Sequence, residues 1–212
     1  MVGGFRGYCT CMFAVGSLLL ATFESRAAPD DSKICAKESG DVAIEACSRA
    51  IKSGRYKGRD LARQYMYRGV EQGLKKEYDL ALADYGEAVR IDKKYADAFY
   101  NRCIVYNLKE EYDRALAECS QAVKFGPSSN ATAASSDGRP ASDHVKSDYY
   151  SERGFAYLKK NDYDHAIMDL DNAIRLNPDN GRALKSRGLV YQAKGDTARA
   201  NADLETTKLF GE

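Results

Sequence analysis

An internal repeat constrains the fold of this chain more than any other feature. An arginine followed by a small residue recurs at intervals of 34, 51 and 34 residues. The middle interval exceeds the other two by 17 residues, so one insertion accounts for the difference. In most units a tyrosine and two alanines follow in the same register. Self-similarity at such a period indicates stacked copies of one structural unit. The recurring arginines are Arg68, Arg102, Arg153 and Arg187.

Each unit has the pattern of an antiparallel helical hairpin. Apolar residues recur at helical spacing on both sides of a short polar turn, which reads "KKEYD", "KEEYD", "KNDYD" or "KGDTA". Small residues stand where the two helices must approach closely, and Pro127 and Pro178 follow second helices, where a helix should stop. Because no hairpin can bury both its faces alone, the pattern predicts an all-α solenoid.

These units resemble the tetratricopeptide repeat family. The 34-residue unit of that family carries the same glycine, tyrosine, alanine and proline columns as "YSERGFAYLKKNDYDHAIMDLDNAIRLNP" at 150–178. The resemblance covers residues 62–129 and 147–212 and implies four full repeats. The stretch "GDVAIEACSRAI" from Gly40 to Ile51 fits the second half of the same unit. We therefore expect a degenerate hairpin with a shortened first helix at the N-terminal end.

The first residues have the layout of a secretory signal peptide. Arg6 precedes an uncharged stretch from Gly7 to Phe23, and small residues follow. These 17 residues are diluted by Gly, Ser and Thr and barely reach the length that a bilayer requires. We expect cleavage near Ala27 or Ala28, and an exported mature protein, periplasmic or secreted, without a membrane span.

The long interval of the repeat contains "NATAASSDGRPASDHVK", which lacks large aliphatic residues apart from Val145. This composition predicts a loop, which either has a function or is tolerated because it lies outside the stack. The expected organisation is a signal peptide at 1–27, a degenerate hairpin and link at 28–61, two repeats at 62–129, a loop at 130–146, and two repeats with a polar cap at 147–212.

Charge and motifs argue against several classes of function. The formal net charge is +1, and residues 1–27 alone account for it, so the remainder gives little support for binding nucleic acid. His144 and His165 have no cysteine or carboxylate arrangement that spells a metal site. No covalent haem motif follows the signal, and no nucleophile elbow or phosphate loop is present. We expect no enzyme activity, no metal and no cofactor.

Removal of the signal would leave four cysteines, an even number that an oxidising compartment favours. The midpoint of Cys35 and Cys47 falls in one expected hairpin turn, and that of Cys103 and Cys119 falls in another. Residues equidistant from a hairpin turn face each other. The sequence therefore predicts the disulfides Cys35 to Cys47 and Cys103 to Cys119.

The repeat register supports this pairing. Cys103 stands where the other three full repeats have glycine, so one repeat has exchanged both a small and a large residue for cysteine. Cys47 and Cys119 occupy a column that is otherwise held by Tyr85, Leu170 and Leu204.

The arginine column has an acidic partner column on the second helices, at Asp84, Glu118, Asp169 and Asp203. One interpretation is a charge-assisted hydrogen bond repeated across each hairpin. The other is a row of arginines that grips an anionic ligand. We favour the first, because the acids recur in register and cancel the charge.

For partner binding, the resemblance implies a concave groove lined by the first helices. Some of these residues could instead pack between neighbouring repeats. The positions that correspond to this face are Met66, Val70, Leu74, Tyr100, Asn101, Ile104, Asn107, Leu108, Ser151, Phe155, Leu158, Arg182, Lys185 and Leu189.

The family also includes a carboxylate-clamp version of the groove, which needs lysine, arginine and asparagine at fixed places. Here Asn101 fits, whereas the other places hold Met66, Val70, Asp148 and Glu152. What remains is an apolar and aromatic strip with a basic end, which suits a peptide or helix with apolar side chains.

The last hairpin departs from the pattern. Asn201, Thr207 and Lys208 replace the aliphatic residues and the alanine of earlier second helices, which makes the outer face polar. A terminal repeat without a following neighbour requires such a face. We expect a self-capped monomer.

The favoured hypothesis is a non-catalytic scaffold that binds a partner protein or peptide. The alternative is an exported thiol-redox or metal-binding protein that uses the four cysteines. A hydrolase that uses the long loop has no supporting set of residues.

Overall fold

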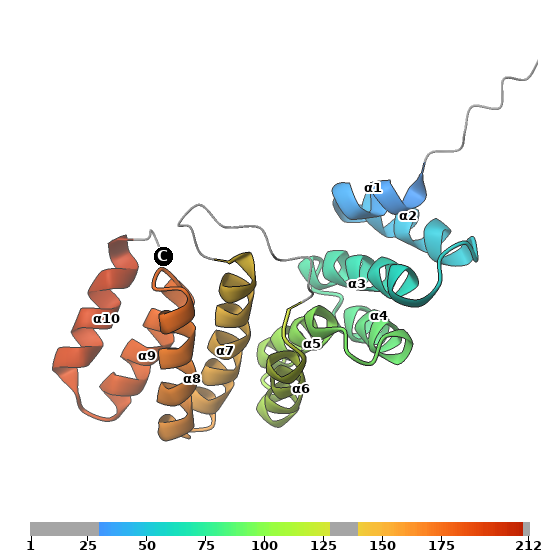
Figure 1. Cartoon of the computed structure of the whole chain (residues 1–212). Coiled ribbons are helices and arrows are strands. Elements are labelled where there is room, and N and C mark those ends of the chain that lie inside the picture. The colour runs from blue at the N-terminus through green and yellow to red at the C-terminus, as the bar shows by residue number, and fades with distance from the viewer. Residues whose placement is uncertain (1–29, 128–139, 210–212) are drawn as a thin grey trace, which may run out of the picture.

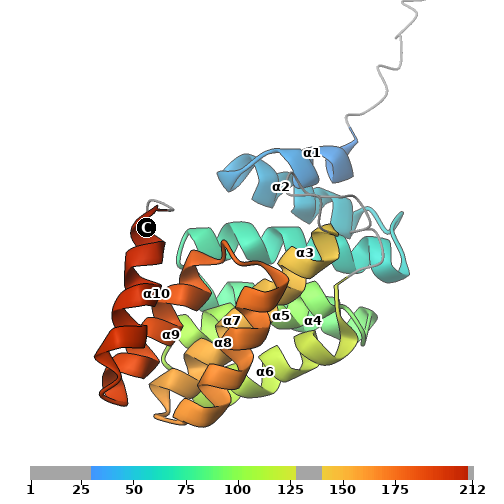
Figure 2. The same cartoon turned by 60° about the vertical axis from the view of Figure 1, so that its left-hand side comes forward.

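The computed structural model describes residues 30–127 and 140–209, and these residues form ten helices. Figures 1 and 2 show antiparallel hairpins that follow one another in chain order from α1 and α2 at one end to α9 and α10 at the other. The predicted all-α solenoid is confirmed. The helices are α1 (Asp31–Lys37), α2 (Gly40–Lys52), α3 (Gly58–Leu74), α4 (Tyr78–Ile91), α5 (Ala96–Leu108), α6 (Tyr112–Phe125), α7 (Ala141–Lys159), α8 (Tyr163–Leu176), α9 (Gly181–Ala193) and α10 (Thr197–Leu209).

The stack is curved, with the first helices of the hairpins on its inner side. Among the first helices α1, α3, α5, α7 and α9, each of the first four contacts the next one along the stack. Between the second helices, α2 to α10, no such contact exists in the described ranges. The first helices therefore lie closer together and line the concave face, as stacked repeats of this kind require.

Glycines of the first helices allow the two helices of a hairpin to meet. A Cβ atom at Gly154 would lie 2.7 Å from Cγ of Leu170, and one at Gly188 would lie 2.9 Å from Cγ of Leu204. Such distances are too short for a side chain. The glycine column thus exists because a large residue on the facing helix fills the space.

Two hairpins replace this packed pair by a disulfide. Cys35 is bonded to Cys47 and Cys103 to Cys119, with Cα–Cα distances of 4.7 and 5.3 Å. Both lie within the limit of about 7 Å for an unstrained bridge. All four cysteines are buried. The structure confirms both predicted pairings.

The arginine column forms the predicted pairs across the full hairpins. Arg153 donates from Nε and Nη2 to both carboxylate oxygens of Asp169, at 2.7 and 2.8 Å. Arg68 with Asp84, and Arg187 with Asp203, have the same two-point geometry. Asp169 is fully buried, and its hydrogen bonds raise the pKa of Arg153. These arginines are committed to structural pairs.

The same arginines also connect neighbouring hairpins, which the sequence did not reveal. Arg68 donates to Ser48 Oγ at 3.0 Å, and Arg187 Nη1 lies 2.6 Å from Asp171 Oδ1. Ser48 and Asp171 occupy equivalent positions, each on the second helix that precedes the arginine. For Arg102, the residue at this position of the preceding helix α4 is Gly86, which has no side-chain acceptor. Arg102 accordingly makes a poorer set of contacts.

The pair of Arg102 and Glu118 is the weak member of the column. Arg102 Nη2 lies 3.0 Å from Glu118 Oε1, while Arg102 Nε and Glu118 Oε2 are buried without a hydrogen-bond partner. Burial raises the pKa of Glu118, and the charge of Arg102 only partly opposes this shift. A side-chain acceptor at position 86 could therefore supply a hydrogen bond that Arg102 lacks.

Replacing Gly86 by serine should raise the free energy of unfolding by about 1 kcal/mol, because a helix gains from losing glycine and Arg102 gains an acceptor. A Cβ atom at Gly86 would meet nothing within 4 Å. Gly86→Ala is the matched control, since helix propensity alone places serine about 0.5 kcal/mol below alanine. Urea denaturation should place Gly86→Ser at or above Gly86→Ala; a clear deficit for serine would contradict the added hydrogen bond.

A row of surface ion pairs also joins successive hairpins. The lysine at the end of one first helix reaches the aspartate in the first turn of the preceding second helix, as in Lys109 with Asp79 at 2.7 Å and Lys194 with Asp164 at 2.8 Å. Lys160 with Asp113 and Lys75 with Asp41 continue the row. Because Asp41 belongs to α2, the N-terminal hairpin shares the register of the full repeats.

Two predicted boundaries are wrong. Helix α7 begins at Ala141, so the predicted loop at 130–146 extends too far, although 130–139 lies outside the described residues. The cause is Val145, which packs against the core group that contains Phe99 and Tyr149 and so extends the helix. Helix α3 begins at Gly58, four residues before the expected first repeat at residue 62.

The predicted signal peptide lies outside the described residues. No helix in the described ranges is both long and apolar enough to cross a membrane. At the other end, Asn201 and Lys208 are exposed on α10, as expected, whereas Thr207 is only 5% exposed and donates to the Leu204 carbonyl at 2.8 Å. That this hairpin caps the stack and that the protein is a monomer stay predictions.

Candidate partner-binding groove

The concave face contains a hollow of about 500 Å³ between the first helices of the last three hairpins. We call it the groove pocket. Because α5, α7 and α9 all contribute, the pocket exists only when these three hairpins are stacked. Its lining residues are Ile104, Asn107, Leu108, Glu152, Phe155, Arg182, Lys185, Ser186 and Leu189.

The walls of the groove pocket are apolar. Ile104, Phe155 and Leu189 come one residue after the small-residue column in successive repeats, so the repeat itself places them in a row. Leu108 follows Ile104 by one helical turn. The exposed fractions of Leu108 and Leu189 are 58% and 42%, so both side chains leave apolar surface accessible beside the hollow.

The floor of the pocket is polar. Glu152 is only 2% exposed and forms an ion pair with Arg182. Asn107 donates from Nδ2 to Glu152 Oε2 at 3.0 Å and to the Glu152 carbonyl at 3.1 Å. A buried carboxylate needs such partners, because an uncompensated charge in the interior is costly. Three hairpins are thereby tied together at one carboxylate.

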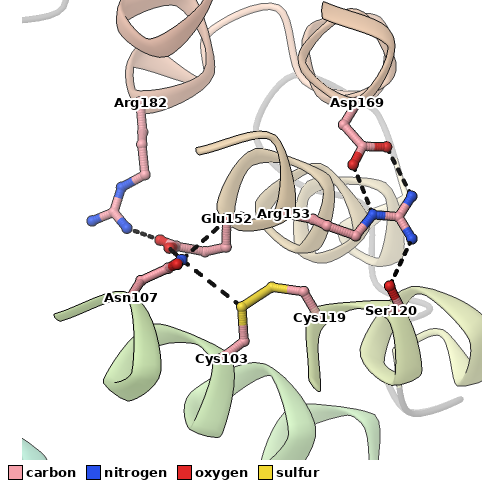
Figure 3. Close-up of a disulfide and its surroundings, with 8 residues drawn as sticks. All are labelled: Cys103, Asn107, Cys119, Ser120, Glu152, Arg153, Asp169 and Arg182. Carbon is pink, nitrogen blue, oxygen red and sulfur yellow. Dashed lines mark hydrogen bonds and ion pairs between the residues drawn. A yellow bond between two sulfur atoms is a disulfide. The ribbon is translucent and has the colours of Figure 1, made fainter. Parts of the chain in front are cut away.

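The disulfide of the second repeat lies next to this floor. Cys103 precedes Asn107 by one turn of α5, and its sulfur lies 3.9 Å from Asn107 Nδ2. Figure 3 shows Asn107 and Arg182 meeting Glu152, while Arg153 extends the other way toward Asp169. Two adjacent residues of α7 therefore have different roles: Glu152 lines the pocket, and Arg153 pairs with Asp169 inside the hairpin.

Lys185 is the cation of the pocket that has no partner. Its side chain is exposed and makes no ion pair or hydrogen bond within the part of the chain that the structure describes. Arg182, one turn earlier on α9, is committed to Glu152. The basic end predicted from the sequence thus consists of Arg182, which is paired although its side chain is 60% exposed, and Lys185, which has no partner among the described residues.

The structure brings half of the predicted groove residues together. Seven of them line the pocket: Ile104, Asn107, Leu108, Phe155, Arg182, Lys185 and Leu189. The others lie elsewhere on the first helices: Met66, Val70, Leu74, Tyr100, Asn101, Ser151 and Leu158.

Most of that second group contributes to packing. Met66, Val70 and Leu158 are half-buried against core clusters. The Tyr100 ring lies 4.9 Å from that of Tyr149, and burial raises the pKa of Tyr100. Ser151 is 1% exposed, so it offers no surface to a partner and its assignment to the groove is corrected.

The two remaining residues have local explanations. Asn101 donates to the Asp97 carbonyl of its own helix at 2.9 Å. Leu74 is 72% exposed at the turn end of α3 but lies outside the pocket.

The groove residues predicted from the sequence omit two lining residues, Glu152 and Ser186, although Glu152 stands at one of the clamp places. The signal for Glu152 was present, because an acid stands there where the other repeats have Tyr67, Asn101 and Ser186. Its pairing with Arg182 depends on how the third and fourth hairpins are stacked, which a single repeat does not reveal.

A curved stack of helical hairpins with a hollow on its concave side defines the class of helical-repeat proteins. Within that class, tetratricopeptide repeat models match residues 75–130 and 147–180. Over these two stretches the chain therefore carries tetratricopeptide repeats.

Solved structures agree with this assignment. A crystal structure of MamA is 20% identical, with a TM-score of 0.62 over 80% of this chain and 86% of that chain. The first tetratricopeptide domain of Spaghetti (RPAP3), bound to the HSP90 peptide SRMEEVD, is 20% identical, with a TM-score of 0.55 over 67% and 99%.

The hetero-tetramer Cut9–Hcn1 of the APC/C contains a chain that is 18% identical, with a TM-score of 0.66 over 81% of this chain and 30% of that chain. At these identities the likeness is one of fold. A comparison with curated proteins gives no match.

Proposed function

We propose that this protein is a non-catalytic interaction scaffold that holds an apolar segment of a partner protein in the groove pocket. The observation that carries this proposal is the exposure of Leu108 and Leu189 around a hollow of about 500 Å³. Burial of such side chains by a partner is favourable at roughly 25 cal/mol per Å² of apolar surface. Apolar anchors that enter a pocket dominate binding in interfaces of this kind.

The comparisons support the general function. The tetratricopeptide domain of Spaghetti was solved with a bound peptide, and its fold is shared by two thirds of this chain. The polar groups differ from the carboxylate clamp implied by the resemblance, because Glu152 replaces a cation and is itself paired with Arg182. A partner with an apolar anchor therefore suits this groove better than a chaperone tail does.

We also propose that the protein works in an oxidising compartment, as an exported protein would. The support is the pairing of all four cysteines that follow the expected signal peptide. Thiol titration of the native mature protein should find no free thiol. Their burial also disfavours the thiol-redox alternative, because a reactive thiol must be accessible to its substrate.

The groove is tested by a matched pair of double variants. Leu108→Ser with Leu189→Ser removes the two exposed pocket side chains and should lower partner recovery after crosslinking by at least about tenfold, since each leucine contributes about 1.5–3 kcal/mol when buried. The control is Leu80→Ser with Met168→Ser, two side chains that are 55% and 53% exposed on the second helices α4 and α8. The control should bind like the wild type, and equal losses would overturn the proposal.

A further inference from the structure

We propose that the segment that fills the groove pocket carries an acidic side chain beside its apolar anchor, and that Lys185 recognises that carboxylate. This inference rests on the proposed function and specifies the chemistry of the partner. It follows from which of the charged residues that line the pocket have an ion-pair partner and which do not.

Three charged residues line the pocket, and two of them neutralise each other. Glu152 is buried; its carboxylate forms an ion pair with Arg182, and Asn107 donates a hydrogen bond to its Oε2. The ammonium of Lys185 remains, exposed and without a partner among the described residues. The free charge of the pocket is therefore positive, and its complement is an anion.

The position of Lys185 sets the distance between anion and anchor. Lys185 and Leu189 are four residues apart on α9, so their side chains are neighbours on one face of the helix. Leu189 contributes to the apolar wall that the anchor would contact. A carboxylate on a residue next to the anchor in the partner can then reach Lys185.

A cationic partner is disfavoured by the same geometry. It would have to displace Arg182 from a carboxylate that is 2% exposed, and it would leave Lys185 facing a like charge. Glu205 and Lys208 of α10 share a second hollow with Lys185, but their opposite charges leave the balance unchanged. A neutral partner would gain nothing from Lys185.

The groove also favours a carboxylate within a chain over a chain end. The first helices α3 and α1 extend the concave face beyond the α5 side of the pocket, so a segment can continue past the pocket along the stack. We therefore assign the carboxylate to an aspartate or glutamate side chain of an internal segment.

The test uses three acetylated and amidated dipeptides, phenylalanyl-glutamate, phenylalanyl-glutamine and phenylalanyl-lysine, titrated into isotopically labelled protein while backbone amide shifts are recorded. The glutamate probe should shift amides around the groove pocket and bind about three- to fivefold more tightly than the glutamine probe, as an exposed ion pair allows. The lysine probe should bind most weakly. Lys185→Gln should abolish the preference for glutamate, and the control Lys208→Gln should preserve it.

Each outcome is decisive. If the glutamine and glutamate probes bind equally, or the lysine probe binds best, this inference is wrong while the apolar pocket stands. If acetyl-phenylalanine, added as a fourth probe, binds more tightly than the glutamate dipeptide, the carboxylate belongs to a chain end instead. If no probe shifts amides at the pocket, both this inference and the proposed function fail.

Discussion

Replacing Cys103 and Cys119 together by alanine should lower the free energy of unfolding by about 3 kcal/mol, because the bridge closes a loop between residues 16 positions apart. Both residues are fully buried, and the bridge joins α5 to α6 in the middle of the stack. Urea denaturation under oxidising conditions measures the loss. Asn107 lies one turn from Cys103, so probe binding at the groove pocket should weaken as well.

A consensus variant distinguishes the bridge from the packing beneath it. Cys103→Gly with Cys119→Leu recreates the pair that Gly154 and Leu170 form in the third repeat, so it should recover much of the lost stability. The end bridge is the positional control: removing Cys35 and Cys47 should increase amide hydrogen exchange in α1 and α2 and leave the groove pocket unaffected. Wild-type stability in the alanine variant would contradict a structural role for the central bridge.

Asp169→Ala should destabilise the protein by about 3–5 kcal/mol, because it removes one partner of a buried ion pair. Asp169 is fully buried, and the side chain of Arg153 is 17% exposed, so the stranded guanidinium would have little access to water. The loss should appear as a lower denaturation midpoint in urea. If the arginine column instead served to bind an anionic ligand, Asp169→Ala would not have to lower the stability of the protein.

The control for this variant is Asp171→Ala. The Asp171 side chain is 51% exposed, and Arg187 retains its two bonds to Asp203 after the change. Its loss should stay below about 1 kcal/mol. Replacing both Arg153 and Asp169 by apolar residues should cost less than Asp169→Ala alone, since no charge is then left buried. If Asp169→Ala and Asp171→Ala lower the free energy of unfolding equally, the arginine and aspartate pairs do not stabilise the contact between the two helices of a hairpin.

Features within one hairpin could be predicted from the sequence. The two helices, the Arg153 and Asp169 pair and both disulfides depend on distance from a turn, and the repeat displays that distance four times. The end of the loop could not be predicted. Val145 extends α7 because it packs against Phe99 and Tyr149, and composition alone does not show this contact.

Contacts between neighbouring hairpins could not be predicted from the sequence. The lysine and aspartate row, the bond from Arg68 to Ser48 and the pair of Glu152 with Arg182 depend on how one hairpin rotates against the next. The same rotation decides which first-helix residues face solvent. This is why Phe155 lines the groove pocket whereas Ser151, one turn earlier on α7, is buried.

The groove pocket as the partner-binding surface is tested most directly by crosslinking in the native compartment, followed by mass spectrometry of the recovered partner. The wild type and the Leu80→Ser, Met168→Ser variant should yield the same crosslinked partner in equal amount. Leu108→Ser with Leu189→Ser should yield about a tenth of it or less. Full recovery with the pocket variant, or a loss confined to the second-helix variant, would contradict the assignment of partner binding to the concave face.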